Sequence, residues 1–344
     1  MGKNNGISRL LCVFTVCIVL ISYNAYSLCF KGRKKEAEAL KIPANGVFAL
    51  EDEEETETLI TEETTPQEQS GEYIPASTDG HVKGRVISRY ISPYNAPLSY
   101  NGVYMKNSTD LSVDIKGLLE SALTFKIKKD DSPQVLIVHT HTTETFMTED
   151  ADFYTEAFSS RTRDSGKNMV SVGEIVAERL NSAGIKTLHD TTEHDYPNYT
   201  GSYSRAAKTV NSYLKKYPSI RVVLDLHRDA VTSNDTDKVK LVTEIEGKKA
   251  AQVMLVMGSQ SGSVTDFPNW KENLKLAVRL QQKIEQKNPT LARPLSLMPK
   301  KYNQNLTTGS LLIEFGTDVN TLEEAHYSAL LVGNALAELF SELT

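Results

Sequence analysis

The chain has 344 residues, a formal net charge of −6 at pH 7 and 40% hydrophobic residues, which is ordinary for a globular protein. The excess of Asp and Glu over Lys and Arg argues against a nucleic-acid partner, because a phosphate-binding surface needs a local excess of basic residues. All three cysteines, Cys12, Cys17 and Cys29, lie in or beside an apolar N-terminal segment. The rest of the chain therefore cannot be held together by a disulfide framework.

The apolar N-terminal segment is predicted to be a membrane anchor. Residues 10–30 read LLCVFTVCIVLISYNAYSLCF without a charge, and roughly twenty such residues cross a bilayer core. Residues 1–9 are then a short cytoplasmic N-terminus. A cleaved signal peptide is the alternative, with small residues near Ser27 as a cleavage site. Four basic residues follow the span, which by charge alone favours a cytoplasmic C-terminal side, whereas the chemistry described below favours an extracytoplasmic one.

Two segments separate the anchor from the main domain. Residues 31–85 are predicted to be a flexible acidic linker, because a stretch such as EDEEETETLITEETTPQEQ cannot bury enough apolar surface to offset the entropy of ordering. An isolated charged helix is the alternative for this stretch. Residues 86–131 are predicted to form an irregular lead-in with one helix, packed against the main domain. The pattern does not distinguish a regulatory role for this lead-in from simple packing.

Residues 132–344 alternate between strand-like and helix-like patterns. Such alternation predicts an α/β domain with a mostly parallel twisted sheet and helices on both faces. The predicted strands are 134–139, 185–189, 220–226 and 310–315, with KVKLVTEIEG and AQVMLVMG also strand-like. The predicted helices are 168–182, 202–216, 269–286 and 321–343.

Side chains of the types that bind metal ions lie at the ends of three predicted strands. The stretch QVLIVHTHTTE carries His139, His141 and Glu144; IRVVLDLHRDA carries His227, and SLLIEFGTD carries Glu314. In an open α/β sheet, ligands collect outside the carboxyl ends of the strands. We therefore expect these side chains to meet in one site.

The residue types in this set suit a catalytic zinc ion. Such a site takes three ligands from His and carboxylate and leaves one position for water, so the predicted ligands are His139, His141, Glu144 and His227. If the first strand continues past position 139, His139 and His141 point to one face and both reach the cation. Glu314 lies in an apolar strand, where an isolated carboxylate is costly. We assign it as the general base that accepts a proton from the metal-bound water.

These residues also allow other interpretations. A lone histidine is more often structural than a ligand, and His189 and His194 are predicted to be an incidental neighbour and a surface or loop residue. A serine hydrolase is the first functional alternative, because MGSQSGS follows a strand, although its spacing is not the GxSxG elbow. A scaffold that binds the cell wall or a partner protein, with a relic metal site, is the second.

The sequence resembles the stage II sporulation protein P family, which is related to zinc-dependent N-acetylmuramoyl-L-alanine amidases. The resemblance rests on VLIVHTHTTETF, NMVSVGEIVAERL, VVLDLHRDA and LLIEFGTDVNTLEEA, in this order from residue 135 onward. It implies a membrane-anchored, extracytoplasmic enzyme that cuts the amide between muramic acid and the stem peptide of peptidoglycan during engulfment. Endopeptidase activity and a lytic transglycosylase partner, stage II sporulation protein D, are also implied.

The resemblance also implies roles for individual residues. His139 or His141, together with His227, would be zinc ligands, and Glu314 the catalytic carboxylate. One departure stands out, because the broader amidase group has a zinc-binding glutamate where this chain has Asn168. The missing ligand would then be His141 or Glu144, and spacing alone does not choose between them.

Overall fold

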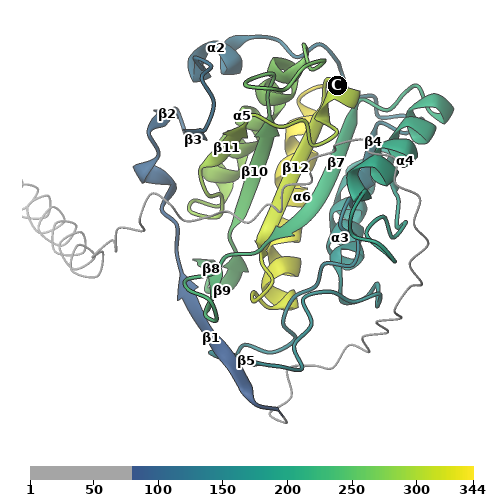
Figure 1. Ribbon diagram of the computed structural model, residues 1–344. Helices are drawn as coiled ribbons and strands as arrows, with labels where there is room; N and C mark the ends of the chain where they lie inside the picture. The colour runs from purple at the N-terminus through teal and green to yellow at the C-terminus, as the bar shows by residue number, and fades with distance from the viewer. Residues whose placement is uncertain (1–79) are drawn as a thin grey trace, which may run out of the picture. The chain divides into compact units, whose positions relative to one another are not determined.

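The computed structural model describes residues 80–344, which form a mixed α/β fold around an eight-stranded sheet (Figure 1). The strands of this sheet, in spatial order, are β2 (Leu98–Tyr100), β3 (Val103–Asn107), β11 (Leu295–Met298), β10 (Val253–Gly258), β12 (Ser310–Thr317), β7 (Val222–Asp229), β4 (Val135–Val138) and β6 (Thr187–His189).

The sheet is mixed, which corrects the prediction of a mostly parallel one. Strands β12, β7, β4 and β6 run parallel, but β10 is antiparallel to β12 and β2 is antiparallel to β3. Parallel neighbours need a crossover connection, whereas a tight turn reverses the chain. Strand β10 follows the hairpin of β8 (Lys238–Ile245) and β9 (Lys248–Ala251), whose turn residues Glu246 and Gly247 have positive φ. It therefore enters the sheet in the reversed direction.

A second, four-stranded sheet lies beside the main one. Its order is β5-β1-β8-β9, with β1 (Val82–Arg89) and β5 (Phe153–Thr155) completing it. Strand β1 pairs antiparallel with β5 and parallel with β8. Strand β1 includes residues 82–85, which were predicted to be the end of the flexible linker, so the linker prediction is wrong at this end.

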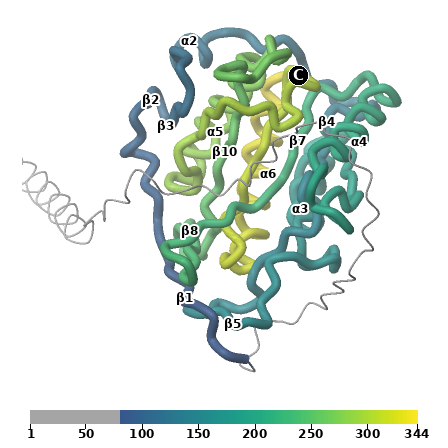
Figure 2. Tube along the Cα trace, viewed as in Figure 1, coloured from purple at the N-terminus to yellow at the C-terminus, as the bar shows by residue number. Residues whose placement is uncertain are grey.

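Helices cover both faces of the main sheet. On one face lie α3 (Met169–Ser182), α5 (Trp270–Lys287) and α6 (Leu322–Ser341), which contribute to the largest apolar core, and α3 and α6 run side by side (Figures 1 and 2). On the other face α4 (Ser202–Lys216) packs against a smaller apolar cluster, near the 3-10 turn η2 (Gln304–Leu306). Helices on both faces were predicted, and helix 202–216 is confirmed at both ends.

Alternation along the central strands decides which side chains reach which face. On β4, Val135 and Ile137 belong to the large core, whereas Leu136 and Val138 pack in the cluster under α4. This is the period-two pattern of a strand buried on both sides. The same alternation on β7 and β12 places the polar residues described below.

The predicted lead-in of residues 86–131 is part of the same fold as residues 132–344. Strands β2 and β3 extend the main sheet at its edge, after the 3-10 turn η1 (Pro93–Asn95). The one predicted helix is α2 (Ile115–Glu120), capped by Asp114 and packed on α5. The fold therefore has no boundary at residue 132.

The predicted cytoplasmic N-terminus, the predicted anchor and residues 31–79 of the predicted linker lie outside the described residues. Within residues 80–344, no helix has the length and apolar character that a membrane crossing requires.

Candidate active site

A cleft of about 620 Å³ opens on the α4 face of the main sheet. It lies beside the carboxyl ends of β4, β7 and β12, which are parallel neighbours and so end at the same edge. Its lining includes two histidines, five acidic or basic residues close to them and three tyrosines: His141, His227, Glu144, Glu314, Asp229, Arg161, Arg228, Tyr199, Tyr203 and Tyr302.

Strand alternation brings Asp225, His227 and Glu314 to the cleft face. The odd-numbered residues of β7 from Val223 share the face that α4 covers, and Glu314 pairs directly with His227 across β12 and β7. All three side chains are buried. Two segments nearly ninety residues apart in the chain thus place an imidazole and a carboxyl group side by side.

The two histidines of the HTH stretch point to different places, which corrects the expectation that they share a face. Strand β4 ends at Val138, and residues 140–143 form a turn. His139 keeps the strand's alternation and points toward α3, where its Nε2 lies 2.8 Å from Nε2 of His189 and its Nδ1 bonds the Leu226 carbonyl. A Cβ at Gly173 of α3 would come within 2.7 Å of His139 Nε2. Of the two, only His141 lines the cleft.

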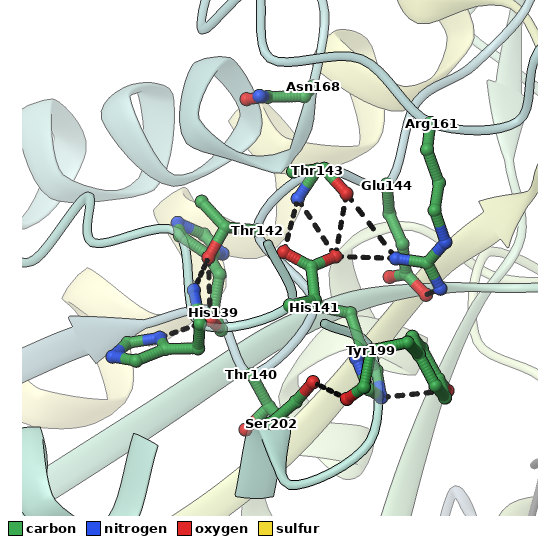
Figure 3. Close-up of polar contacts among 12 residues, drawn as sticks. His139, Thr140, His141, Thr142, Thr143, Glu144, Arg161, Asn168, Tyr199 and Ser202 are labelled. Carbon is green, nitrogen blue, oxygen red and sulfur yellow. Dashed lines mark hydrogen bonds and ion pairs between the residues drawn. The ribbon is translucent and has the colours of Figure 1, made fainter. Parts of the chain in front are cut away.

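His141 lies against His227 in the cleft, and Figure 3 shows its other neighbour, Tyr199. The two rings are 5.2 Å apart in an edge-to-face arrangement, and Tyr199 stacks on His141 at 4.6 Å. A hydrogen bond of 3.2 Å joins the Tyr199 hydroxyl to His141 Nε2. Within the described part of the chain, the buried Nδ1 of His141 has no hydrogen-bond partner. Burial lowers the pKa of His141 well below its ordinary value, so the ring is neutral.

His227 is surrounded by carboxylates. Its Nε2 lies 2.9 Å from Oδ1 of Asp225, although not along the direction of a good hydrogen bond, and its Nδ1 lies 3.8 Å from Oε2 of Glu144. Burial disfavours the imidazolium, but Asp225, Glu144 and Glu314 together raise the pKa of His227 to about 9. The three carboxyl groups therefore favour the positively charged form of His227.

Glu144 reaches the same point from the turn that follows β4. Its Oε2 accepts a hydrogen bond from the backbone N–H of Arg228 (3.1 Å), and its Oε1 lies 4.0 Å from the guanidinium of Arg161. Figure 3 shows the Glu144 carboxylate beside the Arg161 side chain. Its backbone carbonyl accepts from the N–H of Met169, the first residue of α3. Asn168, just before, caps α3 through the N–H of Val170. Glu144 thus stands beside the helix start, where Asn168 itself is engaged in capping.

Glu314 is fully enclosed in the sheet. It is 1% exposed, and its Oε2 has no hydrogen-bond partner among residues 80–344. Burial raises the pKa of Glu314 to about 8, although the neighbouring His227 opposes the shift. A carboxyl group with a pKa near neutrality can both accept and donate a proton.

The donor set fits a zinc ion in chemistry. The candidate ligand atoms are Nδ1 of His141, whose Nε2 bonds Tyr199, Nδ1 of His227, whose Nε2 lies beside Asp225, and the carboxylate of Glu144. Tetrahedral zinc holds such ligands at about 2.0–2.2 Å, which separates them by roughly 3.3 Å. In the structure, Nδ1 of His227 and Oε2 of Glu144 are 3.8 Å apart, which is slightly longer than this spacing. In residues 80–344 no group of three or more His, Cys, Asp or Glu side chains is already closed to metal spacing.

Three residues at the site were not predicted from the sequence: Asp225, Arg161 and Tyr199. Asp225 carried a usable signal, because it stands two residues before His227 in an apolar strand and so shares its face. Arg161 and Tyr199 come from loops with no periodicity, and only the tertiary fold shows their position. His194 was expected on the surface or in a loop; it is in a loop but buried, bonded to the His139 carbonyl and to Thr209.

Comparisons with known proteins agree with the resemblance. The sequence matches the family Stage II sporulation protein P (SpoIIP) over residues 24–341. Stage II sporulation protein P of Bacillus subtilis (strain 168) is 31% identical over 224 residues, which are 62% of this chain and 51% of that protein. The chain therefore spans about half the length of this curated relative.

The solved structures to which this chain is similar include two amidases. N-acetylmuramyl-L-alanine amidase Ami1 of Mycobacterium abscessus is 11% identical with a TM-score of 0.34, covering 60% of this chain and 98% of that one. N-acetylmuramoyl-L-alanine amidase AmiC2 of Nostoc punctiforme is 11% identical with a TM-score of 0.36, covering 62% and 98%. The match over nearly the whole sequence decides the family: this chain belongs to the stage II sporulation protein P family.

Proposed function

We propose that the chain is a zinc-dependent peptidoglycan hydrolase that acts as an N-acetylmuramoyl-L-alanine amidase in sporulation. The observation that carries the proposal is the meeting of His141, His227 and Glu144 in one cleft, beside the buried carboxyl group of Glu314. The sequence motifs shared with the family suggest amidase chemistry. The side chains of His141, His227, Glu144 and Glu314 are suited to that chemistry.

His141, His227 and Glu144 are the proposed zinc ligands. Glu144 supplies the carboxylate that the broader amidase group takes from the start of the helix, because its backbone lies against the first residue of α3. His139, named as a ligand candidate from the sequence, is excluded from this set because it faces α3 and His189. Zinc bound there would polarise the scissile carbonyl and acidify the attacking water.

Glu314 is the proposed proton carrier. In its ionised form, the Glu314 carboxylate accepts a proton of the attacking water and then delivers it to the leaving amine, so no covalent intermediate forms. Burial among apolar residues of β12 raises the pKa of Glu314 to about 8, which is close to neutral pH. Arg161 and Arg228 approach Glu144 at 4.0 and 3.9 Å and balance part of the negative charge of the site.

The cleft suits a glycopeptide substrate. It is about 620 Å³ in volume and carries Tyr199, Tyr203 and Tyr302 in its lining. Tyrosine faces and hydroxyls bind the apolar and polar sides of a sugar or peptide group. A pocket of this volume has room for a ligand of several chemical groups, such as a short segment of a glycopeptide.

The cellular setting is part of the same proposal. We infer an extracytoplasmic catalytic domain, anchored by residues 10–30, that cuts the cell wall during engulfment. We also infer a lytic transglycosylase partner, stage II sporulation protein D, because glycan cleavage and stem-peptide removal complement one another. An endopeptidase activity at peptide cross-links would use the same cleft and the same amide chemistry.

One experiment tests this function directly. The full chain is incubated with purified sacculi, in buffer with zinc and in buffer with a chelator, and the released fragments are separated and sequenced. Amidase cleavage frees stem peptides with a new amino group on the first alanine, only with zinc. Endopeptidase cleavage alone would revise the bond assigned. Sacculi bound but left intact under both conditions would mean a wall-binding scaffold instead of an enzyme.

A further inference from the structure

A second polar feature of the cleft takes no part in the proposed chemistry. Asp318 directly follows β12, Lys238 begins β8, and both line the cleft. The Lys238 ammonium donates a hydrogen bond to Oδ2 of Asp318. Asp318 is 1% exposed, and its other oxygen, Oδ1, has no hydrogen-bond partner in the described part of the chain.

The Lys238–Asp318 pair is held in a fixed position. The N–H of Asp318 bonds the carbonyl of Asp229 at 3.0 Å, across the end of β7. The Lys238 ammonium lies 5.6 Å from the centre of the Tyr154 ring, and the Tyr154 hydroxyl bonds the carbonyl of Thr236. The pair is therefore already ordered at the wall of the cleft, and a ligand that binds it does not meet the entropic cost of fixing these two side chains.

Neighbouring acidic groups are already engaged. Asp229 accepts a hydrogen bond from the N–H of Ala230 and another from Arg293, both at 2.8 Å. Glu314 is assigned to proton transfer above. Asp318 is thus the acidic residue of this wall whose spare oxygen calls for a ligand, because a buried carboxylate oxygen without a partner is costly.

We propose that Lys238 and Asp318 form a subsite for a zwitterionic amino-acid group of the stem peptide. The ammonium of that group bonds Oδ1 of Asp318, and its carboxylate bonds the ammonium of Lys238. The inference rests on the proposed function and names the substrate class of the same cleft: stem peptides whose third residue is a diamino dicarboxylic acid with a free side-chain end.

The pairing of charges explains why a zwitterion fits better than a single charge. A side chain that carries only an ammonium satisfies Asp318 but leaves Lys238 without a new partner. A side chain without charged groups leaves both unsatisfied and displaces their water. A site built to hydrogen-bond a ligand group discriminates against an analogue that lacks the group, and the ratio of kcat/KM values can far exceed about tenfold.

The first test compares three synthetic muramoyl tripeptides that differ only in the third residue: diaminopimelate, lysine or alanine. The full chain with zinc should show kcat/KM at least about tenfold higher for diaminopimelate than for lysine, mainly through KM, and alanine should be poorest. Binding of the same peptides to the Glu314→Gln variant, followed by calorimetry, should give the same order. Equal values for the diaminopimelate and lysine peptides overturn the subsite.

The two proposals fail in distinguishable ways. Absence of cleavage of all three peptides, with binding still ranked by the third residue, would reject the amidase function and support the subsite. Cleavage of all three at equal rates and equal affinities would support the function and overturn the subsite.

Variants locate the preference in the pair. Lys238→Met should bring the ratio of diaminopimelate to lysine affinity toward one, and Asp318→Asn should weaken binding of both peptides. Lys301→Met, at another lysine of the cleft lining, is the matched control and should keep the wild-type order. An unchanged ratio in a folded Lys238→Met protein, checked by circular dichroism, overturns the subsite. Should that variant not fold, the wild-type ranking of the three peptides still decides.

Discussion

Asp225 and His227 stand two residues apart on β7, and their side chains meet on the cleft face of the sheet with Oδ1 2.9 Å from Nε2. Asp225 is itself held by the N–H and the hydroxyl of Thr140, at 2.8 and 2.6 Å. Although burial opposes its ionisation, His227 and Thr140 lower the pKa of Asp225 to about 2. A permanent carboxylate at Nε2 directs Nδ1 of His227 toward Glu144.

Replacement of Asp225 by Asn should therefore weaken zinc binding without removing a ligand. A carboxylate behind a ligating imidazole fixes its orientation and raises its basicity, and its loss typically costs roughly 10–100-fold in metal affinity. Competition with a chromophoric chelator measures the affinity. Glu174→Gln, at an exposed glutamate beside His189, is the control and should bind zinc as the wild type does. Equal affinity in Asp225→Asn would show that Nε2 needs no partner.

The two histidines of the HTH stretch should respond differently to alanine substitution. His141→Ala removes a proposed ligand and should lower zinc affinity by more than the roughly 100-fold limit of an outer-shell change. His139→Ala leaves a cavity against α3 and His189, so it should lower the melting temperature while zinc stoichiometry in the folded protein stays the same. Metal analysis of both purified variants, with a thermal melt of each, separates the outcomes. Zinc lost from His139→Ala and kept by His141→Ala would reverse the assignment.

Glu314→Gln should separate metal binding from turnover. The amide keeps the shape of the side chain but cannot carry a proton, so kcat on muropeptides should fall by about 10²–10⁴-fold. Zinc content should remain that of the wild type, because Glu314 is not among the proposed ligands. Glu178→Gln, at an exposed position of α3, is the matched control and should turn over muropeptides as the wild type does. Normal turnover by Glu314→Gln would reject its role.

Strong local patterns made much of the fold predictable. The helix 202–216 and the strands around residues 135, 224 and 313 follow from apolar periodicity, and Gly184 ends the predicted helix before it with a φ of 79°. Strands β5, β9 and β11 have three or four residues each, too short for a period to show. The direction of β10 depends on a hairpin between two sheets, so alternation alone suggested the wrong sheet type.

The site was predictable in its parts but not in its assembly. The carboxyl ends of β7 and β12 were identified, because an apolar run that ends in His227 or carries Glu314 is unusual. The end of β4 was misjudged by one residue, and a strand that stops at Val138 sends His139 and His141 to different sides of the sheet. Such a shift depends on the turn that Asp195 and Asp225 hold through Thr143 and Thr140, which are contacts distant in sequence.

The ion pair of Asp237 with Arg85 should make stability depend on pH. Asp237 accepts hydrogen bonds from the backbone and guanidinium of Arg85 on β1 and from Asn234, and these hold its pKa below the ordinary value. A lowered pKa means that the stabilisation is complete above the unfolded pKa of about 3.9 and is lost as the pH falls through the folded pKa. Asp237→Asn should thus melt below the wild type at pH 7, and the gap between the two melting temperatures should begin to narrow below about pH 4 and go on narrowing as the pH falls further. Asp235→Asn, at an exposed neighbour in the same loop, should melt like the wild type throughout. A gap between Asp237→Asn and wild type that stays constant down to pH 3 would show that shape, rather than charge, holds β1 to β8.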